Sequence, residues 1–321
     1  MRLVSIIIPT FNRLAELERC LESIGRMNRS GFNVELIIVN DGGAAPDDQR
    51  LTSLANGVEL HLLSQPQSGP AAARNLGVRA ARGDWFAFID DDCLLPSDWP
   101  ARVSDAIRRH PGSMIGGRTV NDLTTNAFSE ASQTLVEYVY EYYNIQSRQR
   151  TPMFASNNML VPAAPLKALG GFDERFRTAE DRELCRRWND AGHATVYEPG
   201  VVVLHAHDLN MASMLRQHFA YGRGAFPYWE KKSGSLRAIA VEPFGFYLAM
   251  LSYPFRMRKR NALMLGMLIA ASQIANAGGF VFSIACKSLR LSSRTSPARS
   301  GEYPREDFPA PPQYPQASLP R

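Results

Sequence analysis

The sequence predicts an α/β fold with a doubly wound, mostly parallel sheet, and two observations support this prediction. Short apolar runs of strand length alternate with amphipathic stretches of helix length in the first third of the chain, a pattern typical of α/β folds. The chain has 321 residues, of which 45% are hydrophobic, so it is long enough to bury a sizeable core. In folds of this class, ligands bind beyond the carboxyl ends of the parallel strands.

The elements of the first half follow from hydrophobic periodicity. Continuous apolar runs bounded by Pro, Gly, Asn or Asp predict buried strands, and apolar residues three or four positions apart predict helices. The expected order is strand 3–8, helix 14–24, strand 34–39, short helix 47–56, strand 58–63, helix 69–81 and strand 85–89. Because parallel strands end at one edge of a sheet, Thr10, Asp41 and Asp90–Asp92 are expected to lie close together.

The second half has a less regular pattern. Its expected elements are a tyrosine-rich helix at 128–145, an amphipathic helix at 180–191, a strand at 201–204 and a helix at 210–222. Glycine favours helix ends, so Gly222-Arg223-Gly224 is expected either to end the last helix or to form a mobile loop.

An uncharged apolar segment runs from Asn261 to Cys286, and its length is sufficient to span a bilayer. It is interrupted by Gln273, Asn276 and Gly278-Gly279. Membrane association is therefore expected, and a buried helix of a soluble domain is the alternative. Positive charge flanks both ends of the segment, so its orientation in a membrane stays open.

The regions beside this segment extend the membrane hypothesis. The apolar run at 244–255 is too short to span a bilayer and is expected at the interface or as a re-entrant segment. The flanking cations suit contact with anionic lipid; they are Arg256, Arg258, Lys259, Arg260, Lys287, Arg290 and Arg294. The chain beyond about residue 292 is rich in Pro, Ser and Arg, which predicts a disordered tail.

Composition limits the classes of partner and compartment. The formal net charge is +5, but the cations do not form one stripe with interleaved aromatic residues, so no nucleic-acid partner is expected. The four cysteines are far apart and lack metal-ligand spacing, which indicates reduced thiols of a cytosolic domain. A strand begins directly after the N-terminus, so no signal peptide is expected.

The triplet Asp90-Asp91-Asp92 is the strongest chemical signal. It follows the apolar run Trp85–Ile89, and neighbouring carboxylates at a strand end repel one another unless they are solvated or neutralised by a cation. Mg²⁺ and Mn²⁺ take such oxygen ligands together with substrate phosphates. A plain acidic turn is the alternative.

The motifs along the chain resemble those of the family 2 glycosyltransferases, which have the GT-A fold. They are Val4–Arg13, Ile38–Gly42, Gly69–Gly77, Phe88–Asp92, Gly170–Glu174, Glu180-Asp181 and His205. The resemblance covers roughly residues 1–225. It implies a Rossmann-like nucleotide-binding half, an acceptor-binding half, and inverting transfer of a sugar from a nucleotide-diphosphate sugar to an acceptor hydroxyl.

The resemblance implies a donor site at the ends of the first two strands. In the family, the first strand end and the Asp after the second strand bracket the nucleobase, and Thr10 and Asp41 occupy these positions. Pro9, Asn12 and Arg13 lie beside them in the sequence. A carboxylate suits this task because it accepts hydrogen bonds from base N–H groups. The alternative role for Asp41 is that of a turn residue.

The triplet matches the family's metal-binding motif. Asp92 is the expected ligand of Mn²⁺ or Mg²⁺, and either Asp90 or Asp91 is expected to face the ribose. The metal would neutralise charge on the leaving diphosphate. His205 is expected near the metal or the diphosphate, with a structural role as the alternative. Arg74 either holds the nucleotide or stabilises the acidic cluster.

Asp181 matches the catalytic base of the family and would accept the proton of the acceptor hydroxyl. A helix N-terminal acidic cluster, formed with Glu180, is the alternative. Glu180 and Arg223 are weaker candidates for contact with the acceptor or the diphosphate. Processive members carry Gln-x-x-Arg-Trp where this chain has Gln217–Tyr221 without Arg-Trp, which favours transfer of single sugars. The tyrosines at 138–143 either pack in the core or stack on acceptor sugars or lipid.

Together these inferences predict an inverting, metal-dependent glycosyltransferase at the cytoplasmic face of a membrane. The expected donor carries UDP, GDP or dTDP, and the expected acceptor is a glycan or a lipid-linked glycan of cell-envelope or exopolysaccharide synthesis. The expected domains are 1–230 (nucleotide-sugar half 1–120, acceptor half 121–230), a membrane-associated or transmembrane segment at 231–290 and the tail at 291–321. The alternatives are a non-catalytic, membrane-anchored protein that binds nucleotide-sugar, and a nucleotidyltransferase.

Overall fold

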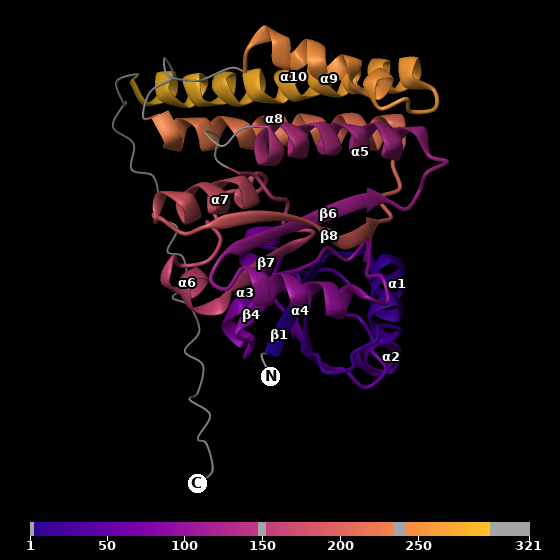
Figure 1. The fold of residues 1–321 in the computed structure, drawn as a ribbon. Helices are drawn as coiled ribbons and strands as arrows, with labels where there is room; N and C mark the ends of the chain where they lie inside the picture. Colours follow the sequence, from indigo (N-terminus) through magenta and orange to yellow (C-terminus); the bar gives the residue numbers. More distant parts are fainter. Residues whose placement is uncertain (1–2, 147–151, 234–241, 296–321) are drawn as a thin grey trace. The chain divides into compact units, whose positions relative to one another are not determined.

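The computed structural model describes residues 3–146, 152–233 and 242–295 (Figure 1). Of the predicted tail at 291–321, residues 296–321 lie outside this part. Contacts divide the chain into two units, Met1–Ser283 and Ile284–Arg321. The sheet and the candidate site belong to the first unit.

One eight-stranded sheet forms the centre of the first unit, with the order β3-β2-β1-β4-β7-β6-β8-β5. The strands are β1 (Leu3–Thr10), β2 (Asn33–Asn40), β3 (Glu59–Ser64), β4 (Trp85–Phe88), β5 (Cys93–Leu94), β6 (Met114–Asn121), β7 (Met159–Pro162) and β8 (Thr195–His205). Strands β1 to β4 are mutually parallel, as are β6 and β8. Strand β7 is antiparallel to both β4 and β6, and β5 is antiparallel to β8. The α/β prediction is confirmed, and the second half of the sheet is mixed.

Helices cover both faces of the sheet. They are α1 (Leu14–Gly25), α2 (Asp48–Leu54), α3 (Pro70–Ala80), α4 (Trp99–Arg109), α5 (Ala127–Tyr140), the π-helix η1 (Glu141–Ile145), α6 (Ala163–Ala168), α7 (Glu180–Asp190), α8 (Met211–Ser233), α9 (Phe244–Arg256) and α10 (Ala262–Thr295). All elements expected over residues 3–89 are present. The sequence analysis missed the helices α4 and α6 and the strands β5, β6 and β7. Strands β5 and β7 are very short, and β6 contains a Gly pair.

The apolar run of β1 is continuous because both of its faces are buried. Ile6 and Ile8 belong to one apolar core, which also contains Leu17 of α1. Ile7 points to the other face and belongs to a second core with Trp188 of α7. This two-sided burial holds the ends of the parallel strands, and the residues that follow them, at one edge of the sheet.

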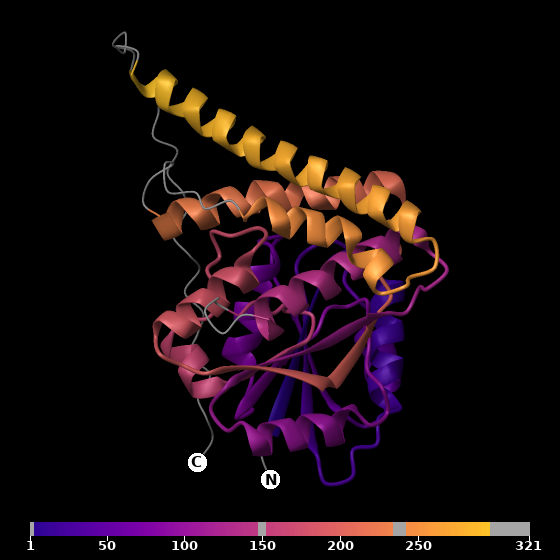
Figure 2. The same ribbon diagram turned by 45° about the horizontal axis from the view of Figure 1, so that its top comes forward.

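A layer of helices, α5, α8, α9 and the first part of α10, covers one side of this fold (Figure 2). Its members share a third apolar core that includes Tyr138, Met214, Met250 and Leu265. Tyr138 also donates a hydrogen bond to the carbonyl of Phe246 at 2.8 Å. Tyr138 therefore packs in a core, which is one of the two roles predicted for the tyrosines of this helix.

Helix α8 does not end at Gly222-Arg223-Gly224 but continues to Ser233. The predicted helix end and the predicted mobile loop at these residues are both wrong. A Cβ at Gly222 would clash with the carbonyl of Asn276 on α10, and one at Gly224 would clash with Thr178. These glycines therefore permit close packing against neighbouring backbone.

Among the described residues, one helical segment, Ala262–Ser288 within α10, is long and apolar enough to cross a membrane, with a mean hydropathy of 1.5. Only 22% of the 18-residue apolar stretch that gives this hydropathy is buried. Helix α9 has 13 residues, which is too short to span a bilayer.

Candidate active site

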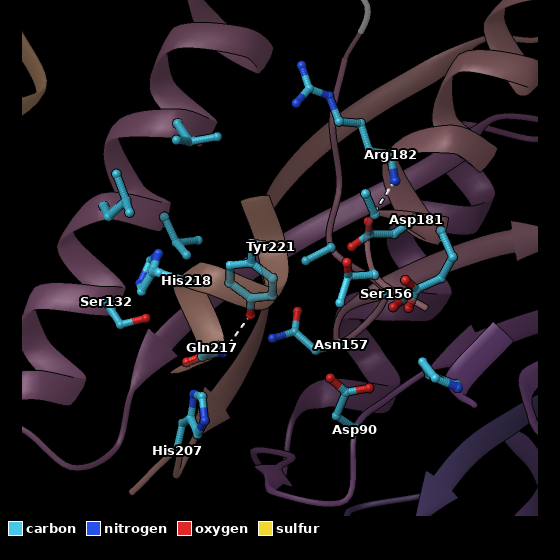
Figure 3. A pocket seen from close by; sticks show the side chains of 18 of the residues that line it. Asp90, Ser132, Ser156, Asn157, Asp181, Arg182, His207, Gln217, His218 and Tyr221 are labelled. Carbon is cyan, nitrogen blue, oxygen red and sulfur yellow. Dashed lines mark hydrogen bonds between the residues drawn. The ribbon is translucent and has the colours of Figure 1, made fainter. Parts of the chain in front are cut away.

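A cavity of about 1110 Å³ lies beyond the carboxyl ends of β1, β2 and β4, and residues of the helix layer also line it. The strand-end residues Thr10, Asp41 and Asp90–Asp92 all reach it, as do Asp181 and His205. Figure 3 shows Asp90 and Asp181 on one side, with the side chains of α8 across from them. The predicted convergence of the strand ends is therefore present.

Asp91 is held by protein contacts inside the wall of the cavity. Its carboxylate accepts a hydrogen bond from the Thr10 hydroxyl at 2.8 Å and pairs with the Arg13 guanidinium at 3.0 Å. Burial raises the pKa of Asp91 to about 7, although Arg13 and Thr10 oppose this shift. The side chain of Asp91 is 4% exposed and that of Asp90 is 33% exposed. Asp90 is therefore the better placed of the two to meet a ligand.

Asp92 stands between two cationic partners. One carboxylate oxygen accepts a hydrogen bond from Arg13 at 2.6 Å, and the other lies 3.2 Å from Nε2 of His205. Burial opposes ionisation of Asp92, but the hydrogen bonds and charges of His205 and Arg13 prevail and hold its pKa below the ordinary value. In turn, burial lowers the pKa of His205, but Asp92 outweighs it and the pKa is raised. Asp92 is therefore an anion at neutral pH.

Arg74 is buried and bridges two carboxylates from distant parts of the chain. Its guanidinium donates to Asp90 at 2.7 Å and to Glu180 at 2.8 Å. Burial raises the pKa of Glu180 to about 7, with Arg74 opposing the shift. The neighbouring Asn75 exchanges hydrogen bonds with the backbone of Phe172. Helix α3 thus connects the end of β4 to the start of α7, and Arg74 stabilises the acidic cluster.

Asp181 lies in the first turn of α7 and faces the cavity. The backbone N–H groups of Arg182 and Ser156 donate hydrogen bonds to its carboxylate. Burial raises the pKa of Asp181, against the effect of these bonds and of Arg74. A carboxylate with a raised pKa and a fixed orientation suits general-base catalysis near neutral pH. Its place in a helical first turn also agrees with the alternative role at a helix N-terminus.

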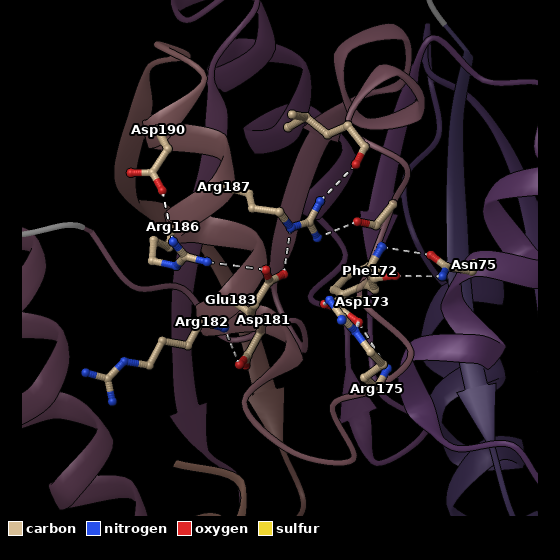
Figure 4. A network of polar contacts seen from close by, with 12 residues as sticks. Asn75, Phe172, Asp173, Arg175, Asp181, Arg182, Glu183, Arg186, Arg187 and Asp190 are labelled. Carbon is tan, nitrogen blue, oxygen red and sulfur yellow. Dashed lines mark hydrogen bonds and ion pairs between the residues drawn. The ribbon is translucent and has the colours of Figure 1, made fainter. Parts of the chain in front are cut away.

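Polar contacts hold α7 in place behind Asp181 (Figure 4). Arg187 donates hydrogen bonds to the carbonyls of Leu169 and Gly171 at 2.9 and 2.7 Å and to Glu183 at 2.7 Å. Glu183 is fully buried, so this charge-assisted bond is protected from solvent. These bonds join α7 to the segment after α6 and set the orientation of its first turn.

The predicted donor residues differ in what they contact. Pro9, Thr10 and Arg13 line the cavity. Asp41 also lines it, but its carboxylate already accepts hydrogen bonds from the side chain of Gln65 and from backbone N–H groups of residues 68 and 69. Asn12 is not among the lining residues; its side chain accepts a hydrogen bond from the backbone of residue 44. Asn12 therefore shapes the loop after β2.

Arg223, a predicted contact of the acceptor or the diphosphate, does not line the cavity either. Its guanidinium lies over the ring of Phe282, 5.6 Å from the centroid. Residue 223 lies inside α8 with its side chain on the α10 side, because the helix does not open into a loop at this point.

The residues around Asp92 fit a hard divalent cation. Ligand atoms of Asp92, Cys93 and His205 lie within 4.8 Å of one another. A carboxylate and an imidazole are suitable ligands for Mn²⁺, whereas a buried thiol is a poor ligand for such an ion. Burial also raises the pKa of Cys93. Asp92 and His205 would therefore hold the ion, and the cavity in front of them has room for phosphate oxygens.

The sequence analysis missed two features of the site. The guanidinium of Arg182, next to Asp181, lies over three aromatic rings, with 4.7 Å to the centroid of Tyr228 and 5.5 Å to that of Trp229. His218 is buried, lines the cavity, and its Nε2 has no hydrogen-bond partner within the described part of the chain. The Arg182 contacts join segments far apart in sequence, so no local pattern could reveal them.

Three comparisons with known proteins show what this chain is similar to. The family model described as Glycosyl transferase family 2 matches residues 5–169. A pre-mycofactocin glycosyltransferase of Mycobacterium tuberculosis (strain ATCC 25618 / H37Rv) is 27% identical over 232 residues, which cover 70% of this chain and 47% of that protein. Glycosyltransferase AglE of Haloferax volcanii is 23% identical over 257 residues, or 78% of this chain and 82% of that protein.

One solved structure shares the fold. It is the mannosyltransferase PcManGT from Pyrobaculum calidifontis in complex with GDP-Man and Mn²⁺, with a TM-score of 0.56 and 18% identity, covering 91% of this chain and 80% of that one. By contrast, this chain spans only about half the length, 47%, of the mycobacterial pre-mycofactocin glycosyltransferase. The similarity to PcManGT supports the GT-A assignment of the fold.

Proposed function

The chain belongs to glycosyl transferase family 2, and from this premise we propose that it transfers single sugars, with inversion and with a divalent cation. It is a glycosyltransferase that takes its sugar from a nucleotide sugar. The observation that carries the finer proposal is that Asp181 and the triplet Asp90–Asp92 line one cavity. This arrangement supports a base and a site for a charged leaving group in the same cavity.

In the proposed reaction, Asp181 accepts the proton of an acceptor hydroxyl while the oxygen of that hydroxyl bonds to the anomeric carbon. The bond from the anomeric carbon to the diphosphate oxygen breaks, and its electron pair leaves with the nucleoside diphosphate. A single in-line displacement inverts the anomeric configuration. The backbone hydrogen bonds from Arg182 and Ser156 orient the Asp181 carboxylate for this transfer.

The donor would lie along the strand ends. Thr10 and Asp41 flank the proposed nucleobase position, and Asp90 is the proposed ribose contact because it is the more exposed of the first two carboxylates. Asp92 and His205 would hold Mn²⁺ or Mg²⁺, which when bound neutralises the negative charge of the diphosphate. The mannosyltransferase PcManGT was solved with GDP-Man and Mn²⁺, which supports including GDP beside UDP and dTDP among the donor nucleotides.

The acceptor half supports an acceptor with apolar parts. Besides polar residues, the cavity is lined by side chains of the helix layer such as Phe246 and Met250. We propose a glycan or lipid-linked acceptor of cell-envelope or exopolysaccharide synthesis, used at the cytoplasmic face of a membrane. Residues 1–120 would form the nucleotide-sugar half, residues 121–230 the acceptor half, and residues 231–290 the membrane-associated segment. The chain lacks the Arg-Trp signature after Gln217, which favours single transfer over polymer extrusion.

Calorimetric binding of UDP, GDP and dTDP to the purified protein, with Mn²⁺ and then with EDTA, tests the donor site. We expect one diphosphate to bind only with the metal. If none binds to folded protein, the proposed donor site is wrong.

The base is tested by Asp181→Asn, with Asp190→Asn as the matched control on the same helix. Asp190 is exposed and pairs with Arg186 on the surface. We expect Asp181→Asn to lower kcat by about 10²- to 10⁴-fold while diphosphate binding is kept. Unchanged turnover would remove Asp181 from the role of base. Binding of nucleotide sugar without any turnover in the wild type would instead favour the non-catalytic alternative.

The nucleotidyltransferase alternative is disfavoured by the loop after β1. Those enzymes usually have a Gly-rich phosphate loop and a Lys after the first strand, whereas this chain has Pro9–Arg13. The guanidinium of Arg13 is occupied by Asp91 and Asp92.

A further inference from the structure

Helices α9 and α10 each present an exposed apolar stripe. The stripe residues are Phe244, Leu248 and Phe255 on α9, and Leu263, Met267, Ile274 and Val281 on α10; Phe282 is also exposed but lies about 100° around the helix from Val281, outside the stripe. At about 100° of rotation per residue, each set falls within about 40° around its helix axis. Two stripes of large apolar side chains are unusual on the surface of a soluble monomer and mark an interaction surface.

The opposite side of each helix is already packed against the catalytic unit. Met250 and Tyr253 of α9 are buried in the same core as Leu265 and Ile269 of α10. These helices therefore have apolar residues on both sides, one facing protein and one facing outward. Such two-sided hydrophobicity is expected where a helix lies between a protein core and an apolar medium.

Helix α10 lies against the catalytic unit over most of its length up to Ser283. Near its start, Leu265 packs in the core that contains α5 and α9. Further along, Gln273 and Asn276 line the same cavity as Asp181, and Gly279 would clash with the backbone of α8 if it carried a Cβ. A bilayer crossed by this part of α10 would also have to contain the polar cavity.

Charged groups beside the stripes set the depth at which α10 begins. Lys259, in the turn between α9 and α10, forms ion pairs with Glu130 at 3.0 Å and with Glu137 at 3.0 Å on α5. Charges are costly in the hydrocarbon region, so α5 and this turn belong at or outside the membrane surface.

We propose that α9 and the part of α10 up to Ser283 lie in the plane of a membrane surface as a monotopic platform, and that this part of α10 does not span the bilayer. The stripes would enter the boundary between headgroups and acyl chains. Arg258 and Arg260, both exposed in the turn between the helices, would meet anionic headgroups. Arg256, in contrast, is paired with Glu141.

The platform would also place the cavity at the membrane. Val281 belongs to the exposed stripe, with 62% of its surface accessible, and it lines the cavity that holds Asp181. The cavity therefore reaches the outward face of α10. A lipid-linked acceptor could enter there without leaving the membrane surface, so this inference rests on the membrane-associated part of the proposed function and specifies its geometry.

Vesicle flotation of the full chain tests the surface. The probes are phosphatidylcholine vesicles with and without phosphatidylglycerol, and the variants are Met267→Glu/Ile274→Glu in the stripe and Leu14→Glu as a matched control on α1. Neither Met267 nor Ile274 lines the cavity, so metal-dependent diphosphate binding should persist in this variant. We expect the stripe variant to lose at least about tenfold in vesicle binding, the control to bind as wild type, and Arg258→Asn/Arg260→Gln to lose the preference for phosphatidylglycerol.

The side of the membrane on which the chain after α10 lies distinguishes a surface platform from a helix that spans the bilayer. Inside-out membrane vesicles from expressing cells expose their cytoplasmic face to added protease. We expect the protease to digest both the catalytic domain and a tag placed after Arg321. A protected tag would overturn the proposal, as would wild-type vesicle binding by the stripe variant. Dimer formation that the stripe substitutions abolish, without vesicle binding by the wild type, would also overturn it and assign the stripes to a second copy. Diphosphate binding is measured separately, so failure here leaves the donor site standing.

Discussion

Replacing Arg74 by Met removes the cation between two carboxylates and keeps most of the side-chain volume. Arg74 is 4% exposed and its two hydrogen bonds, at 2.7 and 2.8 Å, run to Asp90 and Glu180. Asp90 is partly solvated and can recover hydration, so the cost falls mainly on Glu180, whose side chain is 9% exposed. Removing one partner of a buried pair costs about 3–5 kcal/mol. We expect the lower value, about 3 kcal/mol, near pH 6, because Glu180 can take up a proton there.

The pH dependence follows from the pKa of Glu180. Burial raises this pKa from 4.5 to about 7, so the folded state binds a proton that the unfolded chain has lost. Stability therefore falls as pH rises from 4.5 toward 7 and is flat above the folded pKa. Without Arg74, the pKa of Glu180 in the folded state is higher still, so the stability of the protein continues to decline above pH 7. The cost of Arg74→Met should then grow by about 1.4 kcal/mol for each pH unit above 7.

Urea unfolding at pH 6 and pH 8 measures this difference, with fluorescence from the fully buried Trp99 and Trp188 as the signal. Arg102→Met is the control, since Arg102 and its partner Asp98 are both exposed and a surface pair contributes at most about 1 kcal/mol. A cost for Arg74→Met below about 1 kcal/mol, or one that does not change between the two pH values, would refute the reasoning.

Three further outcomes are expected. Asp92→Asn should abolish metal-dependent diphosphate binding in calorimetry, whereas His205→Ala should weaken Mn²⁺ affinity by about 10- to 100-fold; unchanged affinity in both would place the ion elsewhere. Asp181→Asn should remove the limb of the kcat profile that rises with pH through the raised pKa of Asp181, and a retained limb would assign that limb to another group. Gly222→Ala should destabilise by about 1–3 kcal/mol in urea unfolding because its Cβ meets backbone of α10, whereas Gly278→Ala, with its nearest neighbour 3.9 Å away, should not; equal effects would contradict the packing role.

Local pattern was a reliable guide over residues 3–89. The strands and helices over residues 3–89 were predicted from periodicity, because each buries a face whose spacing is visible in the sequence. The meeting of Thr10, Asp41 and the triplet was predicted as well, since parallel strands must end at one edge. The glycines of α8 were misread because their packing partners, Asn276 and Thr178, lie more than forty positions away in the sequence, so locally the glycines resembled a helix end.

The family, the fold class and the residue types that reach the cavity could be inferred without the structure, because these depend on motifs that are contiguous along the chain. The tertiary structure alone decided how those residues are used. It showed Arg74 joined to Glu180, which lies 106 positions away, Asn12 turned to a loop, and Asp91 held by Arg13 and Thr10. It also distinguished the packed side of α10 from the exposed side, which composition cannot do when both sides are apolar. Burial and pairing depend on neighbours distant in sequence, and only the folded chain specifies those neighbours.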